Sequence, residues 1–272
     1  MKTEIYVLTY DKKIKQKYDS KIYQPIVCGA DSVKDTHNYL CDNTDDNISS
    51  LNEYYTELTG EYWAWKNSDA DILGFCHYRR WYVKNLKLDK IDENDILADL
   101  KNHDIILPHH LKFNKTIYEF QKEVNLRHPD YDVEYEDYVQ IESILEKYSP
   151  DYLEAYREVM YGDRLYFNNM FICKRELANE YFEWLFYVLE KIMNEFELEK
   201  YESRDKRIVG FISERLLTTF IVKNKLKIKE YYIYNDEFLF PHTFFIRAGL
   251  PKVYFITQKV YYFILDTMKM IK

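Results

Sequence analysis

DILGFCHYRR, residues 71–80, is the stretch that decides the fold of this chain. Residues 72–76 are all apolar or glycine, a run typical of a strand buried on both faces of a sheet. A histidine and two arginines follow directly. Because open α/β sheets bind ligands beyond the carboxyl ends of their strands, we expect His77, Arg79 and Arg80 to lie at a binding edge.

Short apolar strands alternate with amphipathic helices on both sides of this stretch. The predicted strands span residues 5–9, 25–29, 71–76, 103–108, 169–173 and 226–234. The predicted helices span residues 48–67, 92–101, 116–161 with breaks at Pro129 and Pro150, 176–198 and 207–223. This alternation predicts one α/β domain, residues 1–241, in which helices flank a mainly parallel central sheet.

Composition and charge argue against several classes of protein. The 272 residues carry a net charge of −8 without a long basic block, so a nucleic-acid partner is not expected. The four cysteines form no CxxC pair, which argues against a zinc knuckle or a redox motif. We find neither the pattern of a signal peptide nor a run of about 20 apolar residues. We therefore expect a cytoplasmic protein.

The adjacent arginines Arg79 and Arg80 repel each other unless negative charge neutralises them. Guanidinium groups suit bidentate contacts with phosphate, so a nucleotide diphosphate is one candidate ligand. Structural ion pairs with the many carboxylates of the chain are the other explanation. This segment alone leaves both explanations open.

The helix predicted at residues 48–67 carries Glu57 together with Trp63 and Trp65. Residues two apart do not share one helix face, so we expect one tryptophan in the core and the other towards a cleft. Glu57 is either a buried hydrogen-bonding group or a ligand contact, and both readings stay open.

The helix predicted at residues 207–223 carries the other candidate carboxylate. Arg207, Gly210 and Glu214 recur at steps of three and four, so they lie near one another on this helix. We expect a glutamate flanked by Arg207 and Arg215 to keep a low pKa and to stay ionised. Such a group accepts a proton from a sugar hydroxyl, or it simply pairs with Arg215.

Residues 242–272 form a tail that differs from the rest of the chain. This segment has five Lys or Arg residues against one acid, a net charge of +4, and it is rich in Phe and Tyr. Basic and aromatic residues together suit an interfacial helix on an anionic membrane. A C-terminal helix docked on the core is the alternative.

A series of short motifs between about residue 4 and about residue 233 resembles a known bacterial family. It is the capsular polysaccharide and O-antigen biosynthesis glycosyltransferase family, long labelled a domain of unknown function, which includes galactofuranosyltransferases. The chain departs from it at Tyr10, because the family often has histidine after the first strand. The motifs are Asn47-Ile48-Ser49, Glu57-Leu58-Thr59, Tyr62-Trp63, Trp65-Lys66-Asn67, Gly74, His77-Tyr78-Arg79-Arg80, Asn169-Met170-Phe171 and Glu214-Arg215-Leu216.

The resemblance implies a GT-A-like nucleotide-sugar-binding fold and a UDP-sugar donor. It implies that His77, Arg79 and Arg80 lie at the donor diphosphate. It also makes Glu214 the first candidate for the catalytic base, with Glu57 as the second. The donor-binding residues that we predict are Thr9, Asn47, Lys66, His77, Arg79, Arg80, Asn169, Arg207 and Arg215.

A divalent cofactor, Mn²⁺ or Mg²⁺, is left open by the sequence. Many glycosyltransferases hold such an ion through an Asp-x-Asp motif that follows a strand. Here Asp69-Ala70-Asp71 precedes the strand and would lie at the wrong edge, so we predict a turn or a lead-in to the strand. His77 stays open as a metal ligand, although no Asp or Glu stands beside it in the sequence.

These expectations combine into a hypothesis about function. The chain would transfer galactofuranose or another hexose, with inversion, from a UDP-sugar to a lipid-linked oligosaccharide in capsular or O-antigen synthesis. The tail would place it peripherally on the inner face of the cell membrane. The alternatives are a non-catalytic carbohydrate-binding or assembly protein and a nucleotidyl- or phosphotransferase, which would need an acid pair at a strand end.

Overall fold

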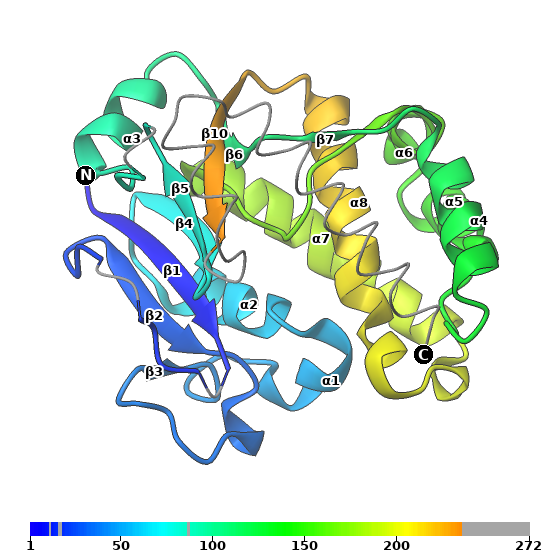
Figure 1. The fold of residues 1–272 in the computed structure, drawn as a ribbon, viewed down its shortest axis with the longest axis horizontal. Coiled ribbons are helices and arrows are strands. Elements are labelled where there is room, and N and C mark those ends of the chain that lie inside the picture. The colour runs from blue at the N-terminus through cyan, green and yellow to red at the C-terminus, as the bar shows by residue number, and fades with distance from the viewer. Residues whose placement is uncertain (11, 16–17, 86–87, 236–272) are drawn as a thin grey trace.

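The computed structural model describes residues 1–10, 12–15, 18–85 and 88–235. An eight-stranded sheet in the order β3-β2-β1-β4-β5-β10-β6-β9 lies to one side of the main helices (Figure 1). Strand β7 pairs separately with β8. The predicted tail, 242–272, lies outside the described residues, so the domain boundary at 241 stays a prediction. The strands are β1 Thr3–Thr9, β2 Tyr23–Val27, β3 Leu40–Cys41, β4 Ile72–His77, β5 Arg80–Val83, β6 Ile105–Pro108, β7 Leu111–Lys112, β8 Arg164–Leu165, β9 Ile172–Lys174 and β10 Ile228–Asn235.

The α/β class is confirmed, but the mainly parallel sheet is not. Strand β1 pairs in parallel with β2 and β4, whereas β5 and β9 are antiparallel to their neighbours. After β4 the chain turns at Tyr78 and Arg79 and returns as β5, where a helical crossover would have kept the strands parallel. Because β9 pairs with both β4 and β6, the strands β4, β5, β10, β6 and β9 close into a ring.

The helices lie mainly in layers to one side of the sheet. Helices α2, α7 and α8 pack near the sheet, and α4, α5 and α6 lie beyond α7 and α8 (Figure 1). No described helix has the length and apolar character needed to cross a bilayer. The helices are α1 Asn52–Tyr55, α2 Leu58–Asn67, α3 Glu93–Asp99, α4 Ile117–Arg127, α5 Tyr135–Tyr148, α6 Leu153–Met160, α7 Arg175–Glu195 and α8 Ile208–Asn224.

Strand β4 is buried on both faces, as its continuous apolar sequence predicts. Leu73 and Phe75 pack into the core that α2, α7 and α8 cover, while Ile72 and Cys76 pack into a second core that includes side chains of α3. Because side chains alternate along a strand, His77 shares the face of Leu73 and Phe75. The last residue of β4 is therefore directed to the side of α2 and α8.

The helix predicted at residues 48–67 is broken in two. Thr56 has a φ of 52° and separates α1 from α2. Threonine is β-branched and rarely adopts positive φ, so the apolar periodicity gives no sign of this break. The predicted breaks at Pro129 and Pro150 are confirmed, because α4 ends before the first and α5 before the second.

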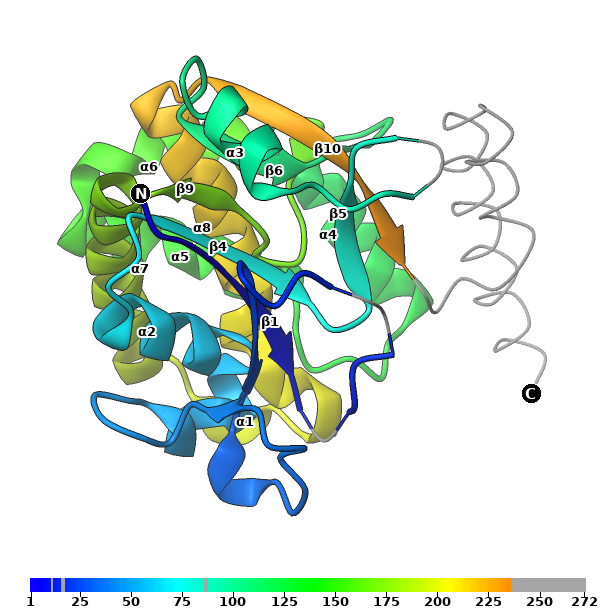
Figure 2. The same ribbon diagram turned by 90° about the vertical axis from the view of Figure 1, so that its left-hand side faces the viewer.

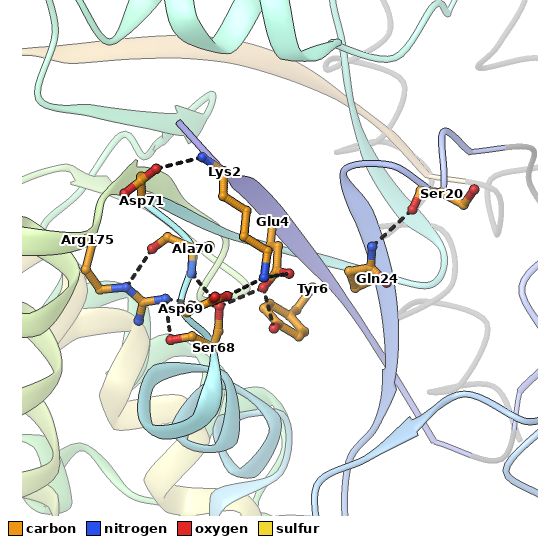
Figure 3. A network of polar contacts seen from close by, with 10 residues as sticks. All are labelled: Lys2, Glu4, Tyr6, Ser20, Gln24, Ser68, Asp69, Ala70, Asp71 and Arg175. Carbon is orange, nitrogen blue, oxygen red and sulfur yellow. Dashed lines mark hydrogen bonds and ion pairs between the residues drawn. The ribbon is translucent and has the colours of Figure 1, made fainter.

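The acid pair Asp69 and Asp71 lies at the amino-terminal edge of the sheet, as the sequence predicts (Figure 3). Asp71 accepts a hydrogen bond of 2.7 Å from the backbone N–H of Lys2, and the Lys2 ammonium pairs with Asp69. Arg175 donates to the backbone carbonyls of Ala70 and Ser68 beside them. The pair therefore belongs to a structural network that joins the chain start to the turn before β4.

Candidate functional site

His77 closes β4 at the carboxyl-terminal edge, and its side chain is buried. Its Nε2 lies 2.8 Å from the carbonyl oxygen of Asn168, just before β9. Burial, followed by the charge of Arg80, lowers the pKa of His77 to about 4. The ring is therefore neutral at physiological pH, and since a carbonyl only accepts, Nε2–H is the donor.

Asn168 and Asn169 join the strand edge to the helices. Both adopt positive φ, 73° and 50°, a conformation that asparagine tolerates better than most residues. The Asn168 N–H donates to Glu214 Oε1 at 2.8 Å. The Asn169 amide nitrogen donates to Glu57 Oε1 at 3.2 Å and to Ser213 Oγ at 2.8 Å. This doublet thus brings the two predicted carboxylates, from α2 and α8, to the same edge.

Glu57 is buried at the start of α2 and held by hydrogen bonds. Besides Asn169, the hydroxyl of Thr56 donates to its Oε2 at 2.6 Å. Burial acts to raise the pKa of Glu57, while the hydrogen bond from Thr56 and the charge of Arg207 act to lower it, and the pKa lies below its usual value. Glu57 is therefore an ionised and fixed carboxylate.

The pKa of Glu214 is shifted in the opposite direction to that of Glu57. Burial raises the pKa of Glu214 to about 7, although Arg215 and the Asn168 N–H act to lower it. Our expectation of a low pKa from the flanking arginines is therefore wrong. Arg215 places its NH1 3.2 Å from Glu214 Oε2, but it also donates to the Phe211 carbonyl, and desolvation prevails.

The arginines of the β4–β5 turn act on the same cluster. Arg79 lies in the turn, and Arg80 starts β5, where its backbone is in register with His77 of β4 and with Asn235 of β10. Figure 2 shows β5 beside β10. Both arginines lower the pKa of His77, and Arg80 also lowers that of Glu214. A diphosphate contact for either arginine stays a prediction.

The structure does not bring every predicted donor-binding residue to this cluster. Lys66 lies in the last turn of α2, away from Glu57, with its ammonium 3.6 Å from the Trp65 ring centre. Asn47 lies in an exposed loop and binds Asp45 through its side chain. By contrast, Thr9 follows Leu8, the residue paired with His77, and therefore lies at the right edge. The charge of Arg207 lowers the pKa of Glu57, so Arg207 belongs to the cluster.

Several residues of the cluster were not predicted as part of it: Thr56, Asn168 and Ser213. Asn168 offers the clearest sequence signal, because an Asn-Asn pair favours left-handed backbone. Tyr10, which departs from the family pattern, also lies near Glu57. Burial, followed by the charge of Glu57, raises the pKa of Tyr10. Thr56 and Asn168 orient the two glutamates directly, because Thr56 donates to Glu57 and the Asn168 N–H donates to Glu214.

Glu61 is a further acid, one turn after Glu57. It is fully buried, and among the described residues neither carboxylate oxygen has a hydrogen-bond partner. Burial, followed by the charge of Glu57, raises the pKa of Glu61 well above its usual value. Burial therefore favours the protonated, uncharged form of Glu61.

Gly210 lets α8 approach Thr56, and we expect Gly210→Ala to destabilise the fold by about 1–3 kcal/mol. An added Cβ would lie 2.7 Å from Thr56 Oγ1, which holds Glu57. The sign of this change in stability is informative, because replacing Gly with Ala inside a helix ordinarily stabilises a protein by about 1 kcal/mol. Urea unfolding measures the effect. In the double variant with Thr56→Ala the loss should be smaller than the sum of the single losses, and additive losses would contradict the contact.

These features define an α/β protein whose candidate site joins two buried carboxylates and several arginines at the carboxyl edge of its sheet. Residues 4–225 match the family described as "Domain of unknown function (DUF4422)", and the chain belongs to that family. The family predicted from the motifs is thereby confirmed.

A solved structure shares the fold. The apo structure of WbbM, a bifunctional glycosyltransferase, matches with a TM-score of 0.75 and 27% sequence identity. The match covers 86% of this chain but 45% of that chain, so this chain corresponds to less than half of that protein. None of the curated proteins matches the chain.

Proposed function

We propose that this chain is a glycosyltransferase that moves a hexose, with galactofuranose as the first candidate, from a UDP-sugar to a lipid-linked oligosaccharide. Capsular or O-antigen polysaccharide would be the product. One observation carries the proposal: Glu214, with a pKa near 7, lies at the same sheet edge as Arg79 and Arg80. Similarity to a bifunctional glycosyltransferase supports it.

The proposed reaction is a direct displacement at the anomeric carbon of the donor. Glu214 takes the proton of the acceptor hydroxyl, and the hydroxyl oxygen forms the new bond to that carbon. The bond from the same carbon to the β-phosphate oxygen breaks, and UDP leaves with the electron pair. A base with a pKa near the working pH suits this task, because it is ionised yet still takes up a proton.

The second carboxylate is better suited to a supporting role. Glu57 is ionised, but Thr56 and Asn169 occupy both of its oxygens. Its low pKa makes it a weaker base than Glu214. We therefore propose that Glu57 positions Asn169, or a hydroxyl of the sugar, while Glu214 takes the proton.

The leaving diphosphate gains negative charge as the bond breaks. Arg79 and Arg80 would stabilise this charge, because fixed cations in a partly dry site act strongly on the transition state. Mn²⁺ and Mg²⁺ prefer oxygen ligands. The carboxylates at this edge already accept hydrogen bonds, and Nε2 of His77 is hydrogen-bonded to the Asn168 carbonyl. These residues do not form a ready ion site, and we derive no step through a metal.

The acceptor would reach the site from the membrane. Asn235 pairs with Arg80, so the described part of the chain reaches residue 235 beside the proposed donor site. A basic, aromatic segment on an anionic membrane would hold this edge near a lipid-linked acceptor. Cytoplasmic location at the inner face of the membrane and inversion, which is favoured through the galactofuranosyl relatives, are part of the proposal.

Nucleotide binding tests the proposal directly. We expect UDP and UDP-sugars to raise the melting temperature of the full chain more than ADP- or GDP-sugars, since a ligand at 100 times its Kd adds about 2.7 kcal/mol of stability. Measurements with and without Mn²⁺ show whether an ion takes part. Release of UDP from a UDP-sugar then separates an enzyme from a non-catalytic carbohydrate-binding protein. A chain that no nucleotide stabilises would overturn the proposal.

A further inference from the structure

A second polar cluster lies where β6 ends, outside the carboxylate site described above. His109 and His110 follow β6 directly, and Glu230 lies in the adjacent strand β10. Nδ1 of His109 is 2.9 Å from Glu230 Oε2, and Nδ1 of His110 is 2.6 Å from Glu230 Oε1. One nitrogen from each ring and one carboxylate thus converge from two neighbouring strands.

The carboxylate of this cluster is oriented by a further residue. Tyr166 donates its hydroxyl to Glu230 Oε1 at 2.8 Å, and the His110 backbone N–H donates to the same oxygen at 3.3 Å. Glu230, His110 and Tyr166 also line a cavity of about 630 Å³ between β10, α6 and α8. The cluster is therefore built into the fold and open to a small ligand.

The cluster lies at the same sheet edge as the carboxylate site. Gly74 of β4 and Ile106 of β6 both pair with Ile172 of β9. His77 at the end of β4 and His109 just after β6, each three residues further on, therefore lie at similar depth on either side of β9. The cavity is also lined by Thr218, one helical turn after Glu214 on α8. The two clusters are separate, but α8 and the segment before β9 connect them.

We propose that His109, His110 and Glu230 bind a divalent transition-metal ion, with Zn²⁺ as the first candidate. Two imidazole nitrogens and one carboxylate are a common three-ligand set for zinc. Within the described part of the chain, these three side chains are the group whose ligand atoms all lie within 4.8 Å of one another. A tetrahedral zinc site needs ligand atoms about 3.3 Å apart for bonds of about 2.0 Å. Each nitrogen therefore moves slightly away from its carboxylate oxygen, from the present 2.9 and 2.6 Å.

Binding requires a simple change in the two histidine rings. Each neutral imidazole carries its proton on Nε2, so that the Nδ1 lone pair faces the ion in place of an Nδ1–H···O bond. Tyr166 keeps its hydrogen bond to Glu230 and acts as a positioning residue for the carboxylate. Three protein ligands leave the fourth position of a tetrahedral ion for water or an oxygen ligand.

Titration of the full chain with Co²⁺ tests the site without any donor or acceptor present. We expect one Co²⁺ per chain, with the intense visible absorption of a four-coordinate ion, and displacement by Zn²⁺. His110→Ala and Glu230→Gln should each weaken binding by more than about 100-fold, because loss of outer residues alone costs about 10–100-fold. Tyr166→Phe should weaken it less, by about 10-fold.

His103→Ala is the matched control, because His103 precedes the other end of β6 and bonds to the Asp99 carbonyl. Its metal binding should equal that of the unaltered chain. The proposal is wrong if the unaltered chain binds neither ion at micromolar concentrations, or if His110→Ala and Glu230→Gln, shown to be folded by circular dichroism, bind as well as the control. UDP binding is measured separately, so its failure would leave this result intact.

Discussion

Glu214→Gln is expected to lower the transfer rate by about 10²–10⁴-fold while the chain stays folded. Glutamine keeps an oxygen that accepts from the Asn168 N–H, so the local structure is preserved. It takes up no proton, so the acceptor hydroxyl loses its base. Steady-state transfer from a UDP-sugar to an acceptor measures the effect, and UDP binding should change little.

The pH dependence of the unaltered enzyme provides an independent check on Glu214. Since the ionised form is the base and its pKa is about 7, the rate should rise with pH and level off above that value. Glu57→Gln should keep an inflection, because the pKa of Glu57 itself lies below its ordinary value. The inflection should move to lower pH, because the charge of Glu57 helps to raise the pKa of Glu214. Loss of the inflection in Glu57→Gln, or its persistence with near-normal rates in Glu214→Gln, would contradict the assignment.

The same group makes stability depend on pH. The pKa of Glu214 is raised from 4.5 to about 7 in the folded state, so between these values the folded chain binds more protons than the unfolded chain. Its contribution to stability is therefore complete below pH 4.5 and is lost as the pH rises through 7. Glu214→Gln should remove this part of the dependence in urea unfolding.

Arg80→Ala is the second change with a large expected effect: kcat/KM for the UDP-sugar should fall by about 10²–10³-fold. The charge of Arg80 lowers the pKa of both His77 and Glu214, so Arg80 lies close to the centre of the proposed site. Removing it leaves the departing diphosphate less stabilised. Arg80→Lys should recover only part of the loss, because an ammonium does not make the bidentate phosphate contact.

Arg127→Ala is the control for this experiment, because Arg127 is an exposed residue at the end of α4 that pairs with Glu123. It should retain full activity. If Arg80→Ala behaves like this control, and Arg79→Ala does too, the diphosphate does not bind at the β4–β5 turn. The structural ion-pair explanation for the two arginines would then stand.

The individual elements were more predictable than their arrangement. Strand β4 follows from a continuous apolar run, and the proline breaks follow from local chemistry. The ring of strands depends on β9 pairing with both β4 and β6, which are distant in the sequence. No local pattern reports such long-range pairing, and none reports the positive φ of Thr56.

The candidate site shows the same division. The motifs identified Glu57, Asn169 and Glu214 one by one, but only the fold shows that Asn169 and its neighbour hold both glutamates. The pKa of Glu214 could not be predicted, because flanking arginines are visible in the sequence and burial is not. The cluster of His109, His110 and Glu230 escaped notice because its members come from strands that are distant in the chain.

The ring of strands has a consequence for association between molecules. A strand at the margin of a sheet can recruit a strand from another copy, which leads to aggregation. In the described residues, β4, β5, β10, β6 and β9 each have neighbours on both sides, and the sheet ends laterally at β3, which is two residues long. The topology itself therefore protects a chain so rich in tyrosine and phenylalanine from polymerising strand by strand.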